Sequence, residues 1–485
     1  MDIPVHLPLF IDHREVPTSD TFEVRDPGRL GDLVGIVHAG GAAHVQQAVD
    51  AAHRAFQAWR EVPVQERVDR LVAAAAALER RAPELAILLV REQGMLLRDT
   101  RRDVANGIRS LREMADIAPG WWQPEQFEDD ESLVRVEKMP RGVVAAIVPW
   151  NAPMGLTMGK VGPALATGNT LVVKPSPNAP LAVSLALQTI AGFFPPGTIN
   201  VVHGDGEVGP ALTRHPRVRM VSFTGGTRTG QAVMGAAAES IKNVALELGG
   251  NDAAIVLDDI TPEAVVPELV KGIFPRSGQV CYAIKRVYVP AAKLDAFFDT
   301  LCAAVGQFRI GHGLDERSTL APVNNRRQYD HVRGLIARAR TAGATVAELG
   351  TPVDGTPWDE GYYLRPTVVK DLAPDAELVQ AEQFGPVIPL VGYASEEDAL
   401  RMANDTEYGL GSSLWARDTA HALALASRVD AGITFINSHA RTRLGEVHMP
   451  FGGIKQSGIG RVRTAVGLAE FVEYHAISLN RTTCR

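Results

Sequence analysis

The sequence predicts an α/β fold with two sheet-containing domains and a small β extension. After residue 140, short apolar runs alternate with helical stretches, which is typical of parallel sheets covered by helices on both faces. The alternation starts again after Gly250, and the chain has 485 residues, more than one ordinary domain of about 150 residues. We therefore expect residues 1–121 and 141–248 to form a first domain, 249–456 a second, and 122–140 with 457–485 the extension.

The first third of the chain is expected to be mostly helical. Apolar residues recur every three or four positions in 43–59 and 67–94, which predicts two amphipathic helices. A third helix is expected from about residue 99 to 118, where Pro119-Gly120 ends it. Residues 133–139 alternate apolar and charged side chains, which predicts a half-exposed strand at an edge or interface.

The middle of the chain predicts buried strands. The short apolar runs that we interpret as strands of the first sheet are 143–148, 170–173, 199–202, 218–223 and 244–246, with a helix over 181–194. Strands at 253–257 and 287–289 begin the second sheet. A late strand over 471–479 is far in the chain from either sheet, so we expect it to pair with a partner subunit.

Composition narrows the class of protein. Hydrophobic residues make up 46% and charged residues 22%, as in soluble globular proteins. The net charge of −7 argues against nucleic-acid binding, which needs a basic face. The three cysteines, 281, 302 and 484, form neither a metal-binding pair nor a disulfide framework. We expect a cytoplasmic protein with no metal, no membrane segment and no signal peptide.

Two glycine-rich turns are candidates for binding a phosphate. Residues 204–209 read G-x-G-x-x-G after a predicted strand, a pattern that suggests a dinucleotide site but also describes an ordinary turn. Residues 223–230 (FTGGTRTG) also join a strand to a helix, whose amides would face an anion. Composition does not choose between them.

Three side chains are candidates for catalysis. Cys281 follows Ser277-Gly278-Gln279 and has Arg276 and Lys285 nearby, which is unusual for a cysteine that merely fills a core. Glu247 is bracketed by apolar residues, so desolvation should raise its pKa and suit it to act as a general base. Asn151 follows a predicted strand, where its amide would donate to an oxyanion or simply make a turn.

Together these segments resemble the non-acylating, NAD(P)-dependent branch of the aldehyde dehydrogenase superfamily, from about residue 20 to the C-terminus. The motifs occur in the family's order and are highly specific in combination. They are PWN (149–151), GNTLVVKPS (168–176), FTGGTRTG (223–230), LELGG (246–250), SGQVC (277–281), EQFGPV (382–387) and PFGGIKQSGIGR (450–461).

The resemblance implies a Rossmann-like cofactor domain, a catalytic α/β domain and an oligomerisation extension, in the order of the three parts above. It implies that Cys281 is the nucleophile, that Glu247 is the general base, and that the Asn151 amide and the backbone N–H of Cys281 form the oxyanion hole. Lys160 lies near a proton exit path. The residues implied to bind the cofactor, NAD or NADP, are Pro149, Trp150, Lys174, Ser176, Pro177, Gly225, Gly226, Gly230, Leu248, Glu382 and Phe384. The 223–230 turn is then the phosphate turn, and 204–209 is not.

Two departures from the family pattern bear on the cofactor and the proton path. Pro177 occupies a position where many NAD-preferring members have a Glu, which leaves the choice between NAD and NADP open. Val462 replaces a Glu thought to relay protons, which leaves the exit route open.

The resemblance also bears on substrate and assembly. The small residues Ala152 and Gly159 leave room for a bulky or aromatic aldehyde. Arg441 and Arg443 lie in a loop that in the family borders the substrate entrance, where they either bind an acid group or are solvated loop residues. A homodimer or homotetramer is expected. The alternatives are a dehydrogenase that acylates coenzyme A, which Glu247 argues against, and a thiol esterase, which would not need Lys174 and Glu382.

Overall fold

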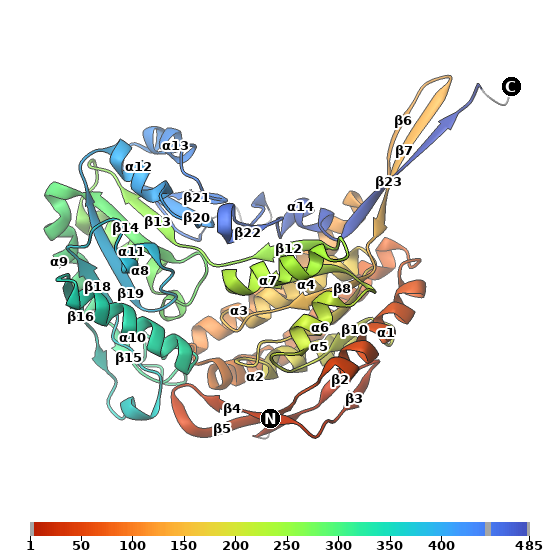
Figure 1. The fold of residues 1–485 in the computed structure, drawn as a ribbon, viewed down its shortest axis with the longest axis horizontal. Helices are drawn as coiled ribbons and strands as arrows, with labels where there is room; N and C mark the ends of the chain where they lie inside the picture. The colour runs from red at the N-terminus through yellow and green to blue at the C-terminus, as the bar shows by residue number, and fades with distance from the viewer. Residues whose placement is uncertain (1–3, 442–447, 483–485) are drawn as a thin grey trace.

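The structure is a computed structural model that describes residues 4–441 and 448–482. Two lobes, each built on one large sheet, lie side by side, and a narrow β arm projects from one of them (Figure 1). Within the described residues, no helix is both long and apolar enough to span a membrane.

The first lobe contains an eight-stranded sheet, and every strand predicted for it is present. Its strands, in spatial order, are β22 (Gly458–Ile459), β12 (Asn243–Glu247), β11 (Val218–Thr224), β8 (Val143–Ile147), β9 (Thr170–Lys174), β10 (Ile199–Val201), β2 (Leu9–Ile11) and β3 (Arg14–Val16). The five central strands, from β12 to β10, are parallel. The edge strand β22 comes from near the end of the chain and pairs antiparallel with β12, placing Gly458 opposite Glu247.

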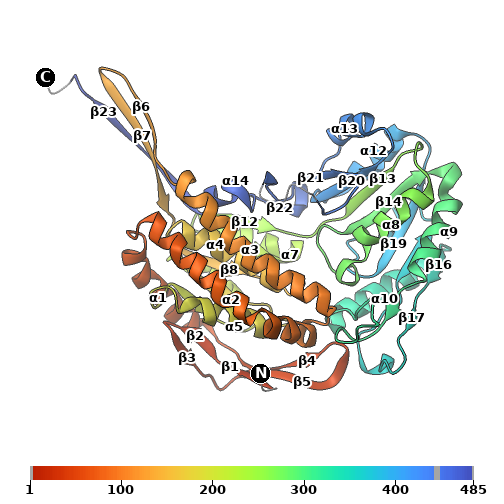
Figure 2. The ribbon, with the colours of Figure 1, turned by 180° about the vertical axis from the view of Figure 1, so that it is seen from behind.

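Helices cover both faces of this sheet, as the buried apolar strands predict. One face packs against α2 (Val64–Gln93), α3 (Leu97–Trp121), α4 (Pro153–Ala166) and α5 (Leu181–Ala191). The other packs against α1 (Ala42–Trp59), α6 (Val208–Arg214) and α7 (Thr227–Ala238). Figure 2 shows the long helices α2 and α3 side by side. Three further strands, β1 (Val5–Leu7), β5 (Arg29–His38) and β4 (Thr21–Asp26), form a small sheet at the N-terminus.

The expected end of the third helix was wrong. Helix α3 continues through Pro119 and Gly120 to Trp121. A proline in the last turn removes only one helical hydrogen bond, and packing compensates for that loss. Trp121 lies under the Lys138 ammonium group, and the Arg67 guanidinium stacks 4.5 Å from the centre of the Trp122 ring.

The second lobe has a seven-stranded sheet. Its strands, in spatial order, are β16 (Thr345–Glu348), β18 (Thr367–Lys370), β19 (Val387–Tyr393), β14 (Ile284–Pro290), β13 (Asp252–Val256), β20 (Gly411–Trp415) and β21 (Ile433–Ile436). Only β16 is antiparallel to its neighbour among these strands. The helices of this lobe are α8 (Pro262–Ile273), α9 (Leu294–Val305), α10 (Arg326–Thr341), α11 (Glu377–Gln380), α12 (Glu396–Asn404) and α13 (Thr419–Ala426), and a short ladder joins β15 (Arg309–Ile310) to β17 (Thr351–Pro352).

The arm is a three-stranded sheet in the order β23 (Val472–Asn480), β7 (Ser132–Pro140) and β6 (Glu125–Glu128). The two strands expected at residues 133–139 and 471–479 are present, and they pair with each other antiparallel over nine residue pairs. Helix α14 (Thr464–Ala469) leads into the arm. Strand β23 is an edge strand of this sheet, and the described residues leave its outer edge unpaired.

Candidate active site

The candidate residues of the first lobe gather at one edge of its sheet. Strands β8, β9, β11 and β12 are parallel, so their carboxyl ends share an edge, the usual ligand site of an open α/β sheet. The residues at these ends are Pro149-Trp150-Asn151 after β8, Lys174 at the end of β9, Gly225 after β11 and Glu247 at the end of β12.

Cys281 is presented by a strained turn of the second lobe. The preceding 3₁₀ turn η1 (Pro275–Gly278) holds Arg276, Ser277 and Gly278 at φ of 52°, 57° and 76°. Left-handed backbone is costly for the two residues that carry a Cβ. At Gly278 a Cβ would lie 2.2 Å from the carbonyl oxygen of Gly385, so this turn requires glycine there.

Two hydrogen bonds join this turn to Asn151. The Asn151 amide is buried, and its Nδ2 donates to the carbonyl of Gln279 over 3.0 Å. In return, Arg276 Nη1 donates to the Asn151 carbonyl over 2.9 Å. Arg276 also pairs at 3.3 Å with the buried Asp103, which accepts the N–H groups of Met154 and Gly155. The structure thus brings the predicted oxyanion donor next to the nucleophile's turn.

Glu247 is a desolvated carboxylate, as expected. Its side chain is 5% exposed, and neither oxygen has a hydrogen-bond partner among the described residues. Burial raises the pKa of Glu247, while the nearby Lys160 ammonium group lowers it. Lys160 lies on α4, is buried, and donates to Ser222 Oγ over 3.1 Å. Burial lowers the pKa of Lys160, and Glu247 opposes that shift.

The predicted nicotinamide-side residues also lie together. The ring of Trp150 meets that of Phe384 edge to face, with centroids 5.5 Å apart. Next to Phe384 in the chain, Glu382 accepts the N–H of Gly250 over 3.1 Å and lies 3.8 Å from Lys285 Nζ. Burial raises the pKa of Glu382, and Lys285 opposes that shift.

The 223–230 turn leads directly into the N-terminus of α7. Gly226 is the residue before the helix, and a Cβ added there would meet nothing within 4 Å. At Gly230 a Cβ would lie 2.4 Å from Leu248 Cδ2, so glycine allows the helix to approach Leu248 closely. Thr224 Oγ1, just before the turn, is buried without a hydrogen-bond partner in the described structure.

The predicted adenosine-side residues lie at the end of β9 and directly after it. Lys174 is buried and donates no side-chain hydrogen bond to the described residues. Burial lowers the pKa of Lys174, and the negative charge of Asp205 opposes that shift. Ser176 Oγ accepts the N–H of Asn178 over 3.3 Å. Pro177, half-buried, follows directly. Asp205 belongs to the 204–209 segment, so this segment lies near the site even though it is not the phosphate turn of the family pattern.

Sequence reasoning missed several buried partners of these residues. Asp103, Asp252 and His439 were not singled out, although each is at most 3% exposed. Asp252 gave the clearest signal, because it is a charged residue at the start of an apolar strand. Nothing in the sequence pointed to Asp103, which is 173 positions from its partner Arg276.

The loop expected at the substrate entrance is only partly described. Arg443 lies outside the described residues, and Arg441 is paired with Glu268 at 3.6 Å. A cavity of about 490 Å³ is lined by Glu113, Asp116, Ile117, His448, Thr464 and Ala465. Phe451 makes two ring contacts: Tyr282, the residue after Cys281, packs on it at 5.0 Å between ring centroids, and the guanidinium of Arg463, the residue before Thr464, lies 4.9 Å from its centroid.

Comparisons with known proteins agree with this geometry. The sequence profile of the aldehyde dehydrogenase family matches residues 15–477. Glutarate-semialdehyde dehydrogenase of Pseudomonas aeruginosa is 35% identical over 478 residues, covering 96% of this chain and 95% of the relative. An aldehyde dehydrogenase of Didymella fabae is 36% identical over 453 residues, with 92% and 90% covered. The crystal structure of betaine aldehyde dehydrogenase from Staphylococcus aureus in complex with NAD⁺ has a TM-score of 0.93 at 31% identity, with 98% and 95% covered.

The fold and these comparisons define an oxidoreductase built on two α/β lobes. The chain belongs to the aldehyde dehydrogenase family. It is an NAD(P)-dependent enzyme that oxidises an aldehyde to the corresponding carboxylic acid.

Proposed function

We propose that this enzyme oxidises a bulky, ring-bearing aldehyde in two stages on Cys281, with Asn151 holding the oxyanion and Glu247 activating water. The observation that carries the proposal is the Glu247 carboxylate, which is buried at the same sheet edge as Asn151 and has no hydrogen-bond partner in the described structure. A carboxylate kept desolvated and unpaired is suited to accept a proton from water.

In the first stage, the Cys281 thiolate attacks the aldehyde carbon and forms a C–S bond, and the carbonyl oxygen becomes an oxyanion. Asn151 has two N–H donors, of which Gln279 takes one. The second is free to donate to the oxyanion with the backbone N–H of Cys281. Each such donor is worth roughly 10²–10³-fold in rate.

In the second stage, water hydrolyses the thioester on Cys281. Glu247 takes a proton from the water as its oxygen attacks the thioester carbon. The C–S bond breaks, the carboxylic acid leaves, and the thiolate is restored. Glu247 then releases its proton, and Glu470 is a candidate to receive it. The negative charge of Glu470 raises the pKa of Glu247, so the two carboxyl groups are near each other, and Glu470 accepts the Arg461 N–H over 3.0 Å.

The residues at the sheet edge fit a dinucleotide. The open position at Gly226, the helix N-terminus behind it and the unpartnered Thr224 hydroxyl suit a pyrophosphate. Lys174, Ser176 and Pro177 would lie at the adenosine ribose, Gly225, Gly230 and Leu248 at the phosphate turn, and Pro149, Trp150, Glu382 and Phe384 at the nicotinamide end. When bound, NAD accepts the hydride that leaves the substrate carbon. We propose NAD as the main cofactor with measurable use of NADP, because Pro177 carries no charge that would repel a 2′-phosphate.

The proposal of a ring-bearing substrate rests on space and on aromatic contacts. A Cβ added to Gly159 would meet nothing within 4 Å, and Tyr282 and Phe451 form an aromatic wall beside the nucleophile. The acid-bearing alternative has less support, because Glu268 already pairs with Arg441.

We propose a homodimer or homotetramer that works in the cytoplasm. One face of β23 carries the exposed apolar side chains of Ile477 and Leu479, and its outer edge is unpaired among the described residues. A second subunit would cover this surface. A thiol nucleophile such as Cys281 is best preserved in a reducing compartment.

The experiment that tests the function is a panel of small, branched and aromatic aldehydes with NAD or NADP, following NADH or NADPH by absorbance and the acid by chromatography. We expect stoichiometric acid and reduced cofactor, with the highest kcat/KM for ring-bearing aldehydes. Ester cleavage without any aldehyde oxidation would support a thiol esterase instead, and turnover that requires coenzyme A would support an acylating dehydrogenase.

A further inference from the structure

Behind Cys281 lies a group of buried charged side chains that the proposed mechanism does not use. Lys285, the second residue of β14, is 2% exposed, and Asp252 and His439 beside it are 1% and 3% exposed. A buried ammonium group is costly unless its donors are satisfied. The partners of Lys285 therefore indicate what this lysine holds in place.

All three hydrogen bonds of Lys285 go to the turn that carries the nucleophile. Its Nζ donates to the carbonyls of Cys281 at 2.5 Å, Val280 at 2.9 Å and Ala283 at 3.4 Å. An ammonium group has three donors, so all of them are directed at this turn. On its other side, Nζ lies 3.8 Å from Glu382 Oε1. Lys285 thus connects the nucleophile's turn to the carboxylate proposed to bind the nicotinamide ribose.

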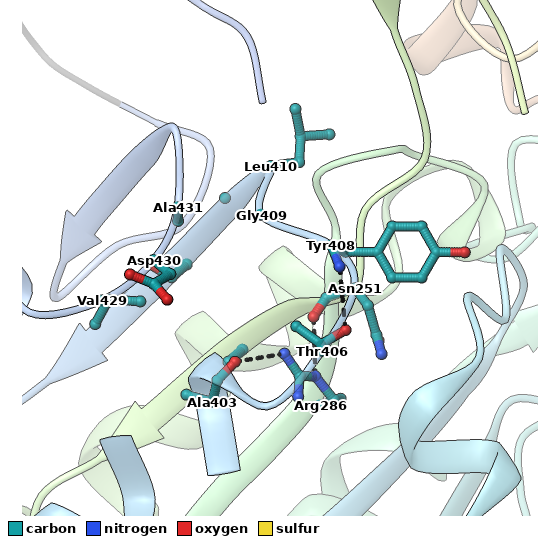
Figure 3. Close-up of a pocket in the computed structure, with 13 residues that line it drawn as sticks. Asn251, Arg286, Ala403, Thr406, Tyr408, Gly409, Leu410, Val429, Asp430 and Ala431 are labelled. Carbon is teal, nitrogen blue, oxygen red and sulfur yellow. Dashed lines mark hydrogen bonds between the residues drawn. The ribbon is translucent and has the colours of Figure 1, made fainter. Parts of the chain in front are cut away.

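The neighbouring cation, Arg286, does not contact the turn that carries Cys281. Side chains alternate along a strand, so Arg286 projects away from the turn. It donates instead to the carbonyls of Asn251, Met402 and Ala403. It lines a cavity of about 10 Å³, room for about one water molecule, and Figure 3 shows its guanidinium directed at Asn251 and Ala403.

Besides Lys285, the charges that act on the Cys281 thiol are the anions Glu247, Glu382 and Asp252. The Arg276 guanidinium, earlier in the turn, is held by Asp103 and the Asn151 carbonyl. Burial lowers the pKa of His439 to about 4, so this ring, which bonds the Tyr282 carbonyl, is neutral near pH 7. Asp252 Oδ1 accepts the Gly411 N–H, while Oδ2 lies 3.7 Å from His439 Nε2. Burial raises the pKa of the Cys281 thiol to about 12; Lys285 lowers it, and Glu247, Glu382 and Asp252 raise it further.

We propose that Lys285 is a positioning residue for Cys281, which holds the turn at residues 280–283 through its carbonyls and favours the thiolate by its positive charge. The inference rests on the proposed role of Cys281 as nucleophile. Asp252 has the opposite effect, because its negative charge disfavours a thiolate nearby.

The test measures the thiol directly, without aldehyde or cofactor. The variants are Lys285→Met, which keeps the apolar stem, and Asp252→Asn, which keeps an acceptor for Gly411. Lys271→Met, an exposed lysine of α8 in the same lobe, is the control. The rate of alkylation of Cys281 by iodoacetamide is followed from pH 6 to 10 by peptide mass spectrometry, which separates Cys281 from Cys302.

We expect Lys285→Met to slow alkylation by about tenfold at each pH in this range, because the thiolate is the reactive form and its fraction falls as the pKa of the thiol rises. Asp252→Asn should speed alkylation at each pH, and Lys271→Met should leave the rate unchanged. If folded Lys285→Met is alkylated at the rate of the wild type, or if Asp252→Asn is alkylated more slowly, the proposal is wrong.

Should Lys285→Met fail to fold, as judged by thermal unfolding, Lys285→Gln replaces it, because glutamine keeps two N–H donors for the turn carbonyls without the charge. Alkylation of Lys285→Gln at the rate of the wild type would overturn the proposal. Failure of the proposed function would look different: alkylation would follow the expected pattern while no aldehyde gave NADH.

Discussion

The buried ammonium group of Lys160 and the buried carboxylate of Glu247 each shift the other's pKa toward the charged form. Burial alone would favour the neutral forms of both. Lys160 comes from α4 and donates to Ser222 of β11, and Glu247 lies at the end of β12, the strand that pairs with β11. We propose that this pair sets the pH range in which Glu247 accepts a proton from water.

Lys160→Met is expected to move the pH profile of turnover to higher pH. The base acts as a carboxylate, so activity rises with pH through the pKa of Glu247. Without the Lys160 charge that pKa rises further, and turnover at pH 7 should fall by about tenfold for each pH unit by which the pKa of Glu247 increases. The measurement is steady-state kcat from pH 5 to 10, with Lys242→Met as the control. A profile identical to that of the wild type would exclude this electrostatic role.

Replacing the nucleophile and the base should separate the two stages. Cys281→Ala is expected to abolish oxidation while cofactor binding, followed by fluorescence, persists. Glu247→Gln should release one NADH per subunit in a rapid burst and then slow by roughly 10²–10⁴-fold, because only hydrolysis of the thioester needs the base. Stopped-flow absorbance gives both phases. Wild-type steady-state turnover in either variant would contradict the assigned role.

Pro177→Glu should increase the preference for NAD over NADP. A carboxylate there would accept hydrogen bonds from the ribose hydroxyls and repel a 2′-phosphate, and we expect selectivity in kcat/KM to rise by about tenfold or more. Glutamine has the shape of glutamate without its charge. The difference between Pro177→Glu and Pro177→Gln therefore measures the repulsion between the carboxylate and the 2′-phosphate. If neither changes the ratio of NAD to NADP affinities, Pro177 does not set cofactor preference.

Gly159→Leu should narrow the substrate range. The side chain would enter the open space beside Gly159, and kcat/KM for benzaldehyde should fall by about tenfold or more while that for propanal is little changed. Glycine is about 0.8–1.0 kcal/mol less favourable than alanine within a helix, and leucine ranks close to alanine, so the melting temperature should not fall. Gly235→Leu on α7, where the added Cβ also meets open space, is the control. Equal loss for both aldehydes would place Gly159 away from the substrate ring.

Charges on the edge of the arm should disrupt assembly. We expect the wild type to be a dimer or tetramer in light scattering at micromolar concentration, and Ile477→Lys with Leu479→Lys to lower the measured mass. Ser478→Lys, on the opposite face of β23, is the control. A wild-type monomer would show that β23 is not an interface.

The sequence predicted features that are local in the chain. Strand ends, the Gly226 turn and the isolated Glu247 are encoded by neighbouring residues, because apolar runs and glycines act within a few positions. The expected helix end at Pro119 was wrong because tertiary packing of Trp121 and Trp122 outweighed a local signal.

One sequence alone does not predict which residues far apart in the chain contact each other. Arg276 meets Asp103, and β7 meets β23 across more than 300 residues; no periodicity identifies such partners. Lys285 was seen only as a polar residue near Cys281. Its three carbonyl contacts depend on the turn geometry, which left-handed residues at 276–278 create and which the residue types alone do not specify.

The antiparallel pairing of Gly458 with Glu247 has a consequence for how the enzyme is made. The sheet that carries the general base receives its last strand from residues 458–459, so a ribosome must release almost the entire chain before that edge is complete. Earlier strands are free to fold during synthesis, since domains generally fold as units from the N-terminus. The sheet edge at Glu247 is therefore among the last parts of the first lobe to be completed as the chain is made.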